Sequence, residues 1–136
     1  MHELALAEAV VTAALKFSDR EGLSELARIE VRVGELQGIR KEIFEFALAE
    51  VMPAVEPRLA STEIHVEIEP ARFHCRSCGV RFSLNEETGL RGAEEVEAVH
   101  LVPELAHAFL RCPACRSPDF EVVAGRGVSI GAIEGR

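Results

Sequence analysis

The sequence lacks any apolar run long enough to cross a membrane. None of its apolar stretches approaches the roughly 20 residues that a bilayer-spanning helix requires. The N-terminus also lacks the basic stretch and the uninterrupted apolar segment of a secretory signal, because Glu3 and Glu8 interrupt it. These absences predict a cytoplasmic protein without a membrane partner.

Positive charge is also scarce. Lys and Arg total 15 against 23 Asp and Glu, which gives a formal net charge of −8, and the basic residues are scattered along the chain. Binding to a phosphate backbone normally requires clustered Lys and Arg. Nucleic acid is therefore not expected as a partner.

Cysteine is sparse, and its placement is the most informative feature of the chain. The only four cysteines form two Cys-x-x-Cys pairs, Cys75 with Cys78 and Cys112 with Cys115, and 33 residues separate the pairs. Two such turns can place four thiolates around one ion in the tetrahedral geometry of closed zinc sites. Because the cytoplasm keeps thiols reduced, metal is favoured over disulfides. We therefore expect a structural zinc ion bound by all four cysteines, with Gly79 allowing the first turn to curl.

The sequence contains no recognisable catalytic arrangement. Four thiolates saturate a tetrahedral ion and leave no position for an activated water, and no nucleophile and base are paired elsewhere. The chain is therefore not expected to be an enzyme. Two other functions use similar cysteine pairs: a rubredoxin-like iron centre for electron transfer, and a zinc-ribbon module that binds nucleic acid. A red colour would reveal the first, whereas binding that weakens steeply with salt would reveal the second.

Hydrophobic periodicity predicts two helices and three strands. Helical spacing indicates helices over about 3–19 and 41–52, the second closed by Pro53 and Pro57. The expected buried stripes are Leu6, Val10, Ala13, Ala14 and Phe17 in the first helix, and Ile43, Phe46, Ala47 and Val51, broadened by Phe44 and Leu48, in the second. Alternating apolar residues predict strands at 29–33, 64–68 and 128–132, and a turn between Gly34 and Gly38. Two helices covering one face of a three-stranded sheet make an α+β unit.

The cysteines lie in a region of different character. Short β-like pieces flank them at 71–74, 81–84, 108–111 and 120–123, and the acidic stretch 85–99 is typical of a solvated loop. This pattern predicts a zinc-ribbon-like domain, residues 71–123, inserted into a first domain of residues 1–70 and 124–136. Because a lobe this small has little apolar surface, we expect its folding to be driven by metal binding, with an apparent binding free energy of roughly 10 to 16 kcal/mol.

The extreme N-terminus is a second candidate for metal chemistry. The α-amine of Met1, the amide nitrogen of His2 and the Nδ1 atom of its ring can chelate one ion, and the amide or carboxylate of Glu3 can supply a fourth ligand. Such a nitrogen-rich planar set suits Ni²⁺ or Cu²⁺ better than Zn²⁺. Taken alone, however, a histidine at position 2 is weak evidence, and an exposed residue at the start of a helix is the preferred interpretation.

Taken together, the motifs resemble the HypA/HybF family of nickel metallochaperones, which act in the maturation of hydrogenase. The resemblance rests on the N-terminal segment 1–7, the strand and turn at 31–36, and the cysteine segments 75–79 and 109–115. It implies a nickel site at Met1, His2 and Glu3, which makes the first domain the nickel-binding one, and a structural zinc at the cysteines. It also implies delivery of Ni²⁺, with a HypB-type GTPase, to the large subunit of NiFe-hydrogenase. The long segment between the cysteine pairs resembles the archaeal type of the family. The sequence does not determine the oligomeric state, and a homodimer is one of the options.

The remaining histidines have competing interpretations. His100 lies in the long segment and is a candidate for an additional nickel ligand, although a surface or packing role is equally compatible. For His107, inside an apolar run, packing is the preferred interpretation. His74 precedes the first cysteine and is expected to lie near the zinc ligands without joining them, and His65 is expected to be exposed on a strand.

Overall fold

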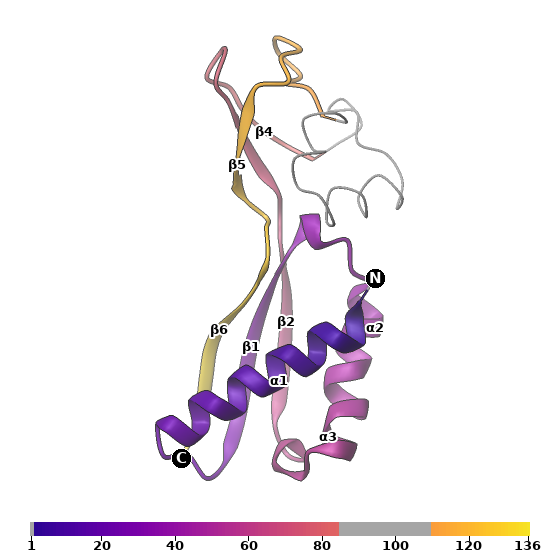
Figure 1. Cartoon of the computed structure of the whole chain (residues 1–136), viewed down its shortest axis with the longest axis vertical. Coiled ribbons are helices and arrows are strands. Elements are labelled where there is room, and N and C mark those ends of the chain that lie inside the picture. Colours follow the sequence, from indigo (N-terminus) through magenta and orange to yellow (C-terminus); the bar gives the residue numbers. More distant parts are fainter. Residues whose placement is uncertain (1, 85–109) are drawn as a thin grey trace. The chain divides into compact units, whose positions relative to one another are not determined.

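The computed structural model describes residues 2–84 and 110–136, which form two compact units (Figure 1). The helical unit comprises residues 2–32, 39–68 and 128–136, and the cysteine unit comprises residues 33–38, 69–84 and 110–127. Each unit contributes to its own three-stranded sheet. The predicted α+β class, with a separate sheet for the cysteines, is therefore confirmed.

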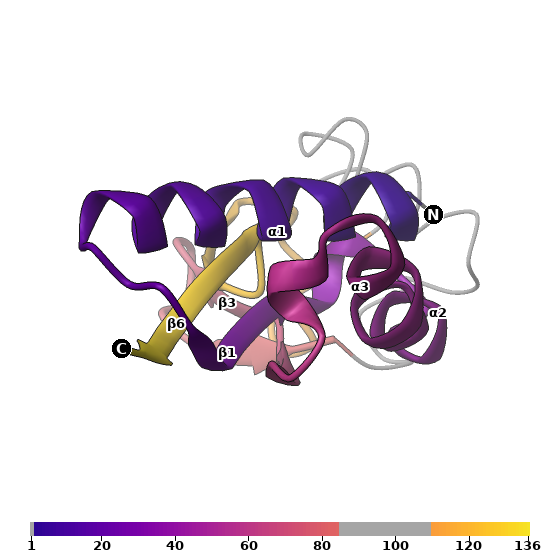
Figure 2. The ribbon, with the colours of Figure 1, turned by 90° about the horizontal axis from the view of Figure 1, so that it is seen from below.

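The sheet of the helical unit forms where alternation in the sequence predicted strands. It contains β1 (Leu26–Gly34), β2 (Glu63–Glu69) and β6 (Val128–Gly135) in the order β2-β1-β6. Strands β1 and β2 run in the same direction and β6 runs opposite to them (Figure 1). Helix α1 (Glu3–Arg20) lies across one face of this sheet (Figure 2).

The second helical segment continues past the proline that was predicted to end it. It consists of α2 (Lys41–Phe46), the π turn η2 (Ala47–Val51) and α3 (Met52–Val55), followed by the 3₁₀ turn η3 (Pro57–Leu59). Pro53 cannot donate to the carbonyl four residues earlier, and its ring crowds that carbonyl. The π turn before it widens the helix and makes room for the proline ring, so the chain stays helical through Val55. The helix ends at Glu56, which is extended because it precedes Pro57. No helix in the described residues is both long and apolar enough to span a membrane.

The buried faces of the helices differ from the predicted stripes. In the second helical segment the buried residues are Phe44, Ala47, Leu48 and Met52, whereas Ile43 and Phe46 are 46% and 60% exposed. Phe44 and Leu48 are one turn apart, so the face centred on them turns Ile43 and Phe46 outward. In α1 the buried residues are Glu3, Ala7, Val10, Val11, Ala14 and Ser18. The predicted stripe is correct there for Val10 and Ala14, but Ala13 is exposed and Leu6 and Phe17 are only half-buried.

The cysteine unit is built on a small antiparallel sheet. Strands β3 (Arg72–Cys75), β4 (Arg81–Ser83) and β5 (Phe120–Ala124) pair in the order β4-β3-β5. Their aromatic side chains form the core: the Phe73 ring centroid lies 5.1 Å from that of Phe82 and 5.3 Å from that of Phe120. The strand predicted at 108–111 is wrong for Leu110 and Arg111, which lie in no strand, and its first two residues fall outside the described ones.

Residues 33–38 pack with the cysteine unit. The predicted turn between the two glycines is the 3₁₀ turn η1 (Glu35–Gln37), which ends at Gly38. The N–H of Leu36 donates to the carbonyl of Gly125 at 3.0 Å, and the Glu35 carboxylate accepts from the N–H of Ala71 at 2.8 Å. These bonds join the turn to both ends of the inserted segment.

Candidate metal centres

The four cysteine sulfurs converge on one point. Cys75 Sγ lies 3.6 Å from Cys115 Sγ, Cys78 Sγ lies 3.7 Å from Cys112 Sγ, and the four ligand atoms lie within 4.8 Å of one another. A tetrahedral ion with metal–sulfur bonds of about 2.3 Å has ligand–ligand distances of about 3.8 Å. The arrangement therefore fits a four-thiolate zinc ion. Among the described residues, this is the one group of three or more side chains of metal-ligating type that comes together in this way.

The two cysteine turns have the same backbone geometry. In the first, the N–H of Gly79 donates to the carbonyl of Cys75 at 3.0 Å, and the φ angle of Gly79 is 80°. In the second, the N–H of Arg116 donates to the carbonyl of Cys112 at 2.8 Å, and the φ angle of Arg116 is 65°. Each turn therefore curls back under its sulfurs through a left-handed residue just after its second cysteine. Glycine adopts this conformation without strain, whereas arginine does so at a cost.

Hydrogen bonds between the turns hold them in place. Ser77 Oγ lies 3.0 Å from Ser117 Oγ across the centre. The Arg76 guanidinium donates from Nη1 to the Asp119 carboxylate and to the carbonyl of Phe120, both at 3.0 Å. Because Arg76 lies in the first turn and the other two follow the second, the contacts fix the spacing of the two cysteine pairs.

The electrostatics of the four cysteines favour a bound cation. The N–H of Cys78 donates to Cys75 Sγ at 3.5 Å, which lowers the pKa of the Cys75 thiol to about 6. The N–H of Ser117 lowers the pKa of Cys115, but burial and the three neighbouring sulfurs together raise it to about 12. In the absence of a metal, four thiolates this close repel one another. A divalent ion relieves the repulsion, so the donor set and its geometry fit the expected metal.

The predicted nickel residues lie at the start of α1. His2 is the exposed N-cap residue, and the N–H of Leu6 donates to its carbonyl at 2.8 Å. Glu3 is only 7% exposed, and its Oε1 atom accepts a hydrogen bond from the N–H of Arg40 at 3.0 Å. Burial raises the pKa of the Glu3 carboxyl, but the N–H of Arg40 and other hydrogen bonds outweigh burial and leave it below its usual range. Met1 lies outside the described residues.

The contact between Glu3 and Arg40 had no signal in the sequence. The acceptor is a side chain and the donor is a backbone group 37 positions away, so no motif or spacing connects them. The structure thus gives the Glu3 carboxylate a role in joining the start of α1 to the start of α2, in addition to the predicted role of Glu3 as a ligand.

The other histidines take separate positions. His74 Nδ1 lies 3.1 Å from Glu121 Oε1, a cross-strand pair on the outer face of the cysteine sheet. His65 is exposed on β2, as expected. His100 and His107 lie outside the described residues, so the hypotheses about them stay predictions.

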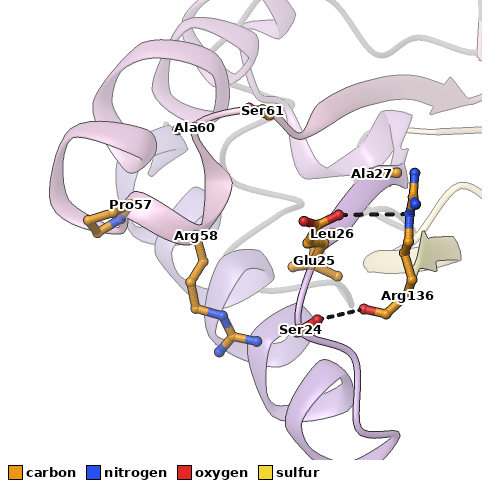
Figure 3. A pocket seen from close by; sticks show the side chains of 9 residues that line it. All are labelled: Ser24, Glu25, Leu26, Ala27, Pro57, Arg58, Ala60, Ser61 and Arg136. Atoms are coloured by element: carbon orange, nitrogen blue, oxygen red, sulfur yellow. Dashed lines mark hydrogen bonds and ion pairs between the residues drawn. The ribbon is translucent and has the colours of Figure 1, made fainter.

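A hollow of about 450 Å³ in the helical unit carries two arginines (Figure 3). Their guanidinium groups are engaged within the chain: Arg58 Nη1 lies 2.9 Å from Asp19 Oδ1, and Arg136 Nε lies 3.8 Å from Glu25 Oε2. Ser24 Oγ donates to the carbonyl of Arg136 at 3.1 Å. These contacts join the turn after α3 to the end of α1, and the end of β6 to the segment after α1, so both arginines have a structural role.

Comparison with known proteins agrees with the motifs. A family model described as "Hydrogenase/urease nickel incorporation, metallochaperone, hypA" matches residues 1–135. The Hydrogenase maturation factor HypA of Thermococcus onnurineus is 46% identical over 134 residues, which cover 98% of this chain and 95% of that protein. The factor of the same name from Pyrococcus abyssi is 43% identical over 134 residues, with the same coverage.

Solved structures show the same fold at lower sequence identity. The solution structure of the Ni metallochaperone HypA from Helicobacter pylori aligns with a TM-score of 0.62 at 15% identity and covers 99% of this chain and 97% of that one. A second solution structure, of a HypA protein, aligns with a TM-score of 0.61 at 15% identity. These likenesses concern the fold alone.

Proposed function

Since the chain belongs to the HypA family of nickel metallochaperones for hydrogenase maturation, we propose that it binds Ni²⁺ at its N-terminus and passes the ion to the large subunit of NiFe-hydrogenase. A HypB-type GTPase is the proposed partner in the transfer. The observation that carries the proposal is the family match over residues 1–135, which includes both the N-terminal segment and all four cysteines. Membership of this non-enzymatic family also argues against the two alternative functions, electron transfer by a rubredoxin-like iron centre and nucleic-acid binding by a zinc ribbon.

The proposed nickel ligands are the amine of Met1, the amide nitrogen and imidazole of His2, and the backbone amide of Glu3. The exposure of His2 supports this set, because an exchangeable ion needs an accessible ligand. The Glu3 carboxylate already accepts a hydrogen bond from Arg40, which favours the amide of Glu3 as the fourth ligand. Amine, amide and imidazole nitrogens form a planar set that suits Ni²⁺.

We propose separate roles for the two metals. The four-thiolate centre holds Zn²⁺ permanently and stabilises residues 71–123, whereas residues 1–70 and 124–136 form the nickel-binding domain. All four zinc positions are filled by sulfur, so this ion has no open coordination site for exchange. His100 is proposed as an additional imidazole that joins or regulates the nickel site.

Release of nickel is proposed to follow from the ligand chemistry. Amine, amide and imidazole nitrogens must all give up protons to bind the ion, so nickel affinity is expected to fall as the pH is lowered. The proposed setting is the cytoplasm, where reducing conditions keep the four thiols available for metal.

Isothermal titration of Ni²⁺ into the protein with a free Met1 amine tests the nickel site. We expect His2→Ala to weaken binding at least tenfold, because the imidazole and the chelate ring are lost. His65→Ala is the matched control, since His65 is also exposed but lies on β2. Equal affinities of wild type and His2→Ala would remove the N-terminal site from consideration.

A further inference from the structure

Three large apolar side chains lie exposed close to the proposed nickel ligands. Leu4 is 49% exposed, Ile43 is 46% exposed and Phe46 is 60% exposed. Leu4 and Ile43 line the same shallow hollow as His2, with a volume of about 460 Å³. Phe46 follows Ile43 by three residues and lies on the same side of α2. The three therefore form one apolar strip from the start of α1 onto α2.

Carboxylates surround this strip. Glu8 lines the hollow, and Glu42, Glu45 and Glu50 are exposed on the helical segment that begins with α2. None of these four carboxylates forms an ion pair in the described part of the chain, and neither does Lys41 at the start of the same helix. Within residues 2–84 and 110–136, these carboxylates are thus not paired with any cation.

We propose that this face, Leu4, Ile43 and Phe46 with the glutamates around them, docks a protein surface that has an apolar pocket rimmed by Lys and Arg. Adjoining exposed apolar side chains mark interaction sites when a polar rim encloses them. A basic rim would neutralise the four glutamates and would speed association at low salt. Phe46, the most exposed of the three, is the expected anchor.

A second copy of this chain fits the face poorly. The chain carries a formal net charge of −8, and pairing this face with itself would set its glutamates against one another. The occupant is therefore a different protein. The inference builds on the proposed function: because His2 lines the same hollow, the docked protein would reach the nickel ligands, as a partner in ion transfer must.

The experiment measures the affinity of the purified HypB-type GTPase and of the purified hydrogenase large subunit for variants of this chain. We expect Phe46→Ser to weaken binding of at least one of them by tenfold or more, and the double change Glu42→Lys with Glu45→Lys to slow association and reduce its salt dependence. Phe46→Leu should restore most of the affinity. Val123→Ser is the matched control, because Val123 is 48% exposed on β5 of the cysteine unit.

The possible outcomes separate this inference from the proposed function. Unchanged nickel titration and thermal unfolding of Phe46→Ser, together with lost partner binding, would support the docking face. Affinities equal to those of Val123→Ser for both proteins would overturn it, as would a lack of binding by the wild type. Sedimentation that showed a wild-type dimer lost in Phe46→Ser would assign the face to self-association and overturn the proposal as well. Loss of nickel binding in His2→Ala is measured separately and does not depend on these results.

Discussion

At the scale of single residues, the second cysteine turn contains a backbone strain that the first turn avoids. Arg116 has a φ angle of 65° where the first turn has Gly79, with a φ angle of 80°. For an L-residue, the left-handed conformation costs roughly 1 to 2 kcal/mol. A glycine at this position would avoid the strain but would lose more conformational entropy on folding, which costs about 0.5 to 1 kcal/mol. This entropy cost offsets part of the strain of Arg116.

Arg116→Gly is therefore expected to stabilise the zinc-loaded protein by up to about 1 kcal/mol, because the relief of strain exceeds the added entropy cost. Thermal unfolding of the metal-bound protein measures the change. Arg116→Ala is the control, since it removes the side chain but keeps the strained backbone, and should leave the unfolding temperature nearly unchanged. An Arg116→Gly protein less stable than Arg116→Ala would show that the arginine conformation is not strained.

Glu3 gives a second prediction at this scale. Glu3→Ala leaves the N–H of Arg40 without its acceptor and should cost about 1.5 to 3 kcal/mol, the usual range for hydrogen bonds to charged groups. Glu3→Gln keeps an acceptor oxygen and should cost less. Nickel affinity should stay within about threefold of wild type in Glu3→Gln, because the carbonyl oxygen of the new side chain can still accept the hydrogen bond from the N–H of Arg40 and hold the start of α1 in place. If Glu3→Gln lost as much nickel affinity as His2→Ala in the same titration, the carboxylate itself would be a ligand.

At the scale of elements, the junction between β5 and β6 depends on close packing of backbone. Gly125 has a φ angle of 97°, and a Cβ atom there would overlap the backbone of Ala71. Its N–H donates to the Glu69 carboxylate at 2.7 Å, and its carbonyl accepts from Leu36. Three segments distant in the sequence therefore meet at this glycine.

Gly125→Ala is expected to destabilise the protein by about 2 to 5 kcal/mol, the sum of the left-handed penalty and the overpacking penalty. Chemical denaturation measures the loss. Gly22→Ala separates the two terms: its φ angle is 73°, but nothing lies within 4 Å of an added Cβ, so only the conformational cost applies. Equal losses in the two variants would contradict the close packing at Gly125.

At the scale of the whole molecule, the two units depend on different sources of stability. The helical unit has an apolar core that includes Phe44, Leu48, Ile29 and Val66, all nearly fully buried. The cysteine unit has a smaller core, and its four sulfurs repel one another unless a cation is bound. Its fold is thus linked to metal more closely than that of the helical unit.

Removal of zinc should therefore unfold the cysteine unit and spare the helices. We expect Cys75→Ala, or a strong chelator, to release the metal and to expose the amides of β3 and β5 to hydrogen exchange, while the helical circular dichroism signal stays largely intact. Elemental analysis before and after treatment identifies the metal, and iron in place of zinc would contradict the assignment. Ser77→Ala is the control, because it changes the same turn without removing a sulfur. Retention of one zinc per chain in Cys75→Ala would refute the ligand assignment.

The sequence by itself determined the chemistry of the four-thiolate centre and the α+β class. Both follow from residue type at short spacing, since a Cys-x-x-Cys turn positions its own sulfurs and alternating apolar residues specify a half-buried strand. Only the tertiary structure decided which sides of the helices are buried, how the chain passes Pro53, and where the Glu3 carboxylate binds. These outcomes depend on partners far away in the chain. Helical periodicity leaves the packing direction of a broadly apolar helix such as 41–55 undetermined, and no local pattern encodes a bond between Glu3 and Arg40.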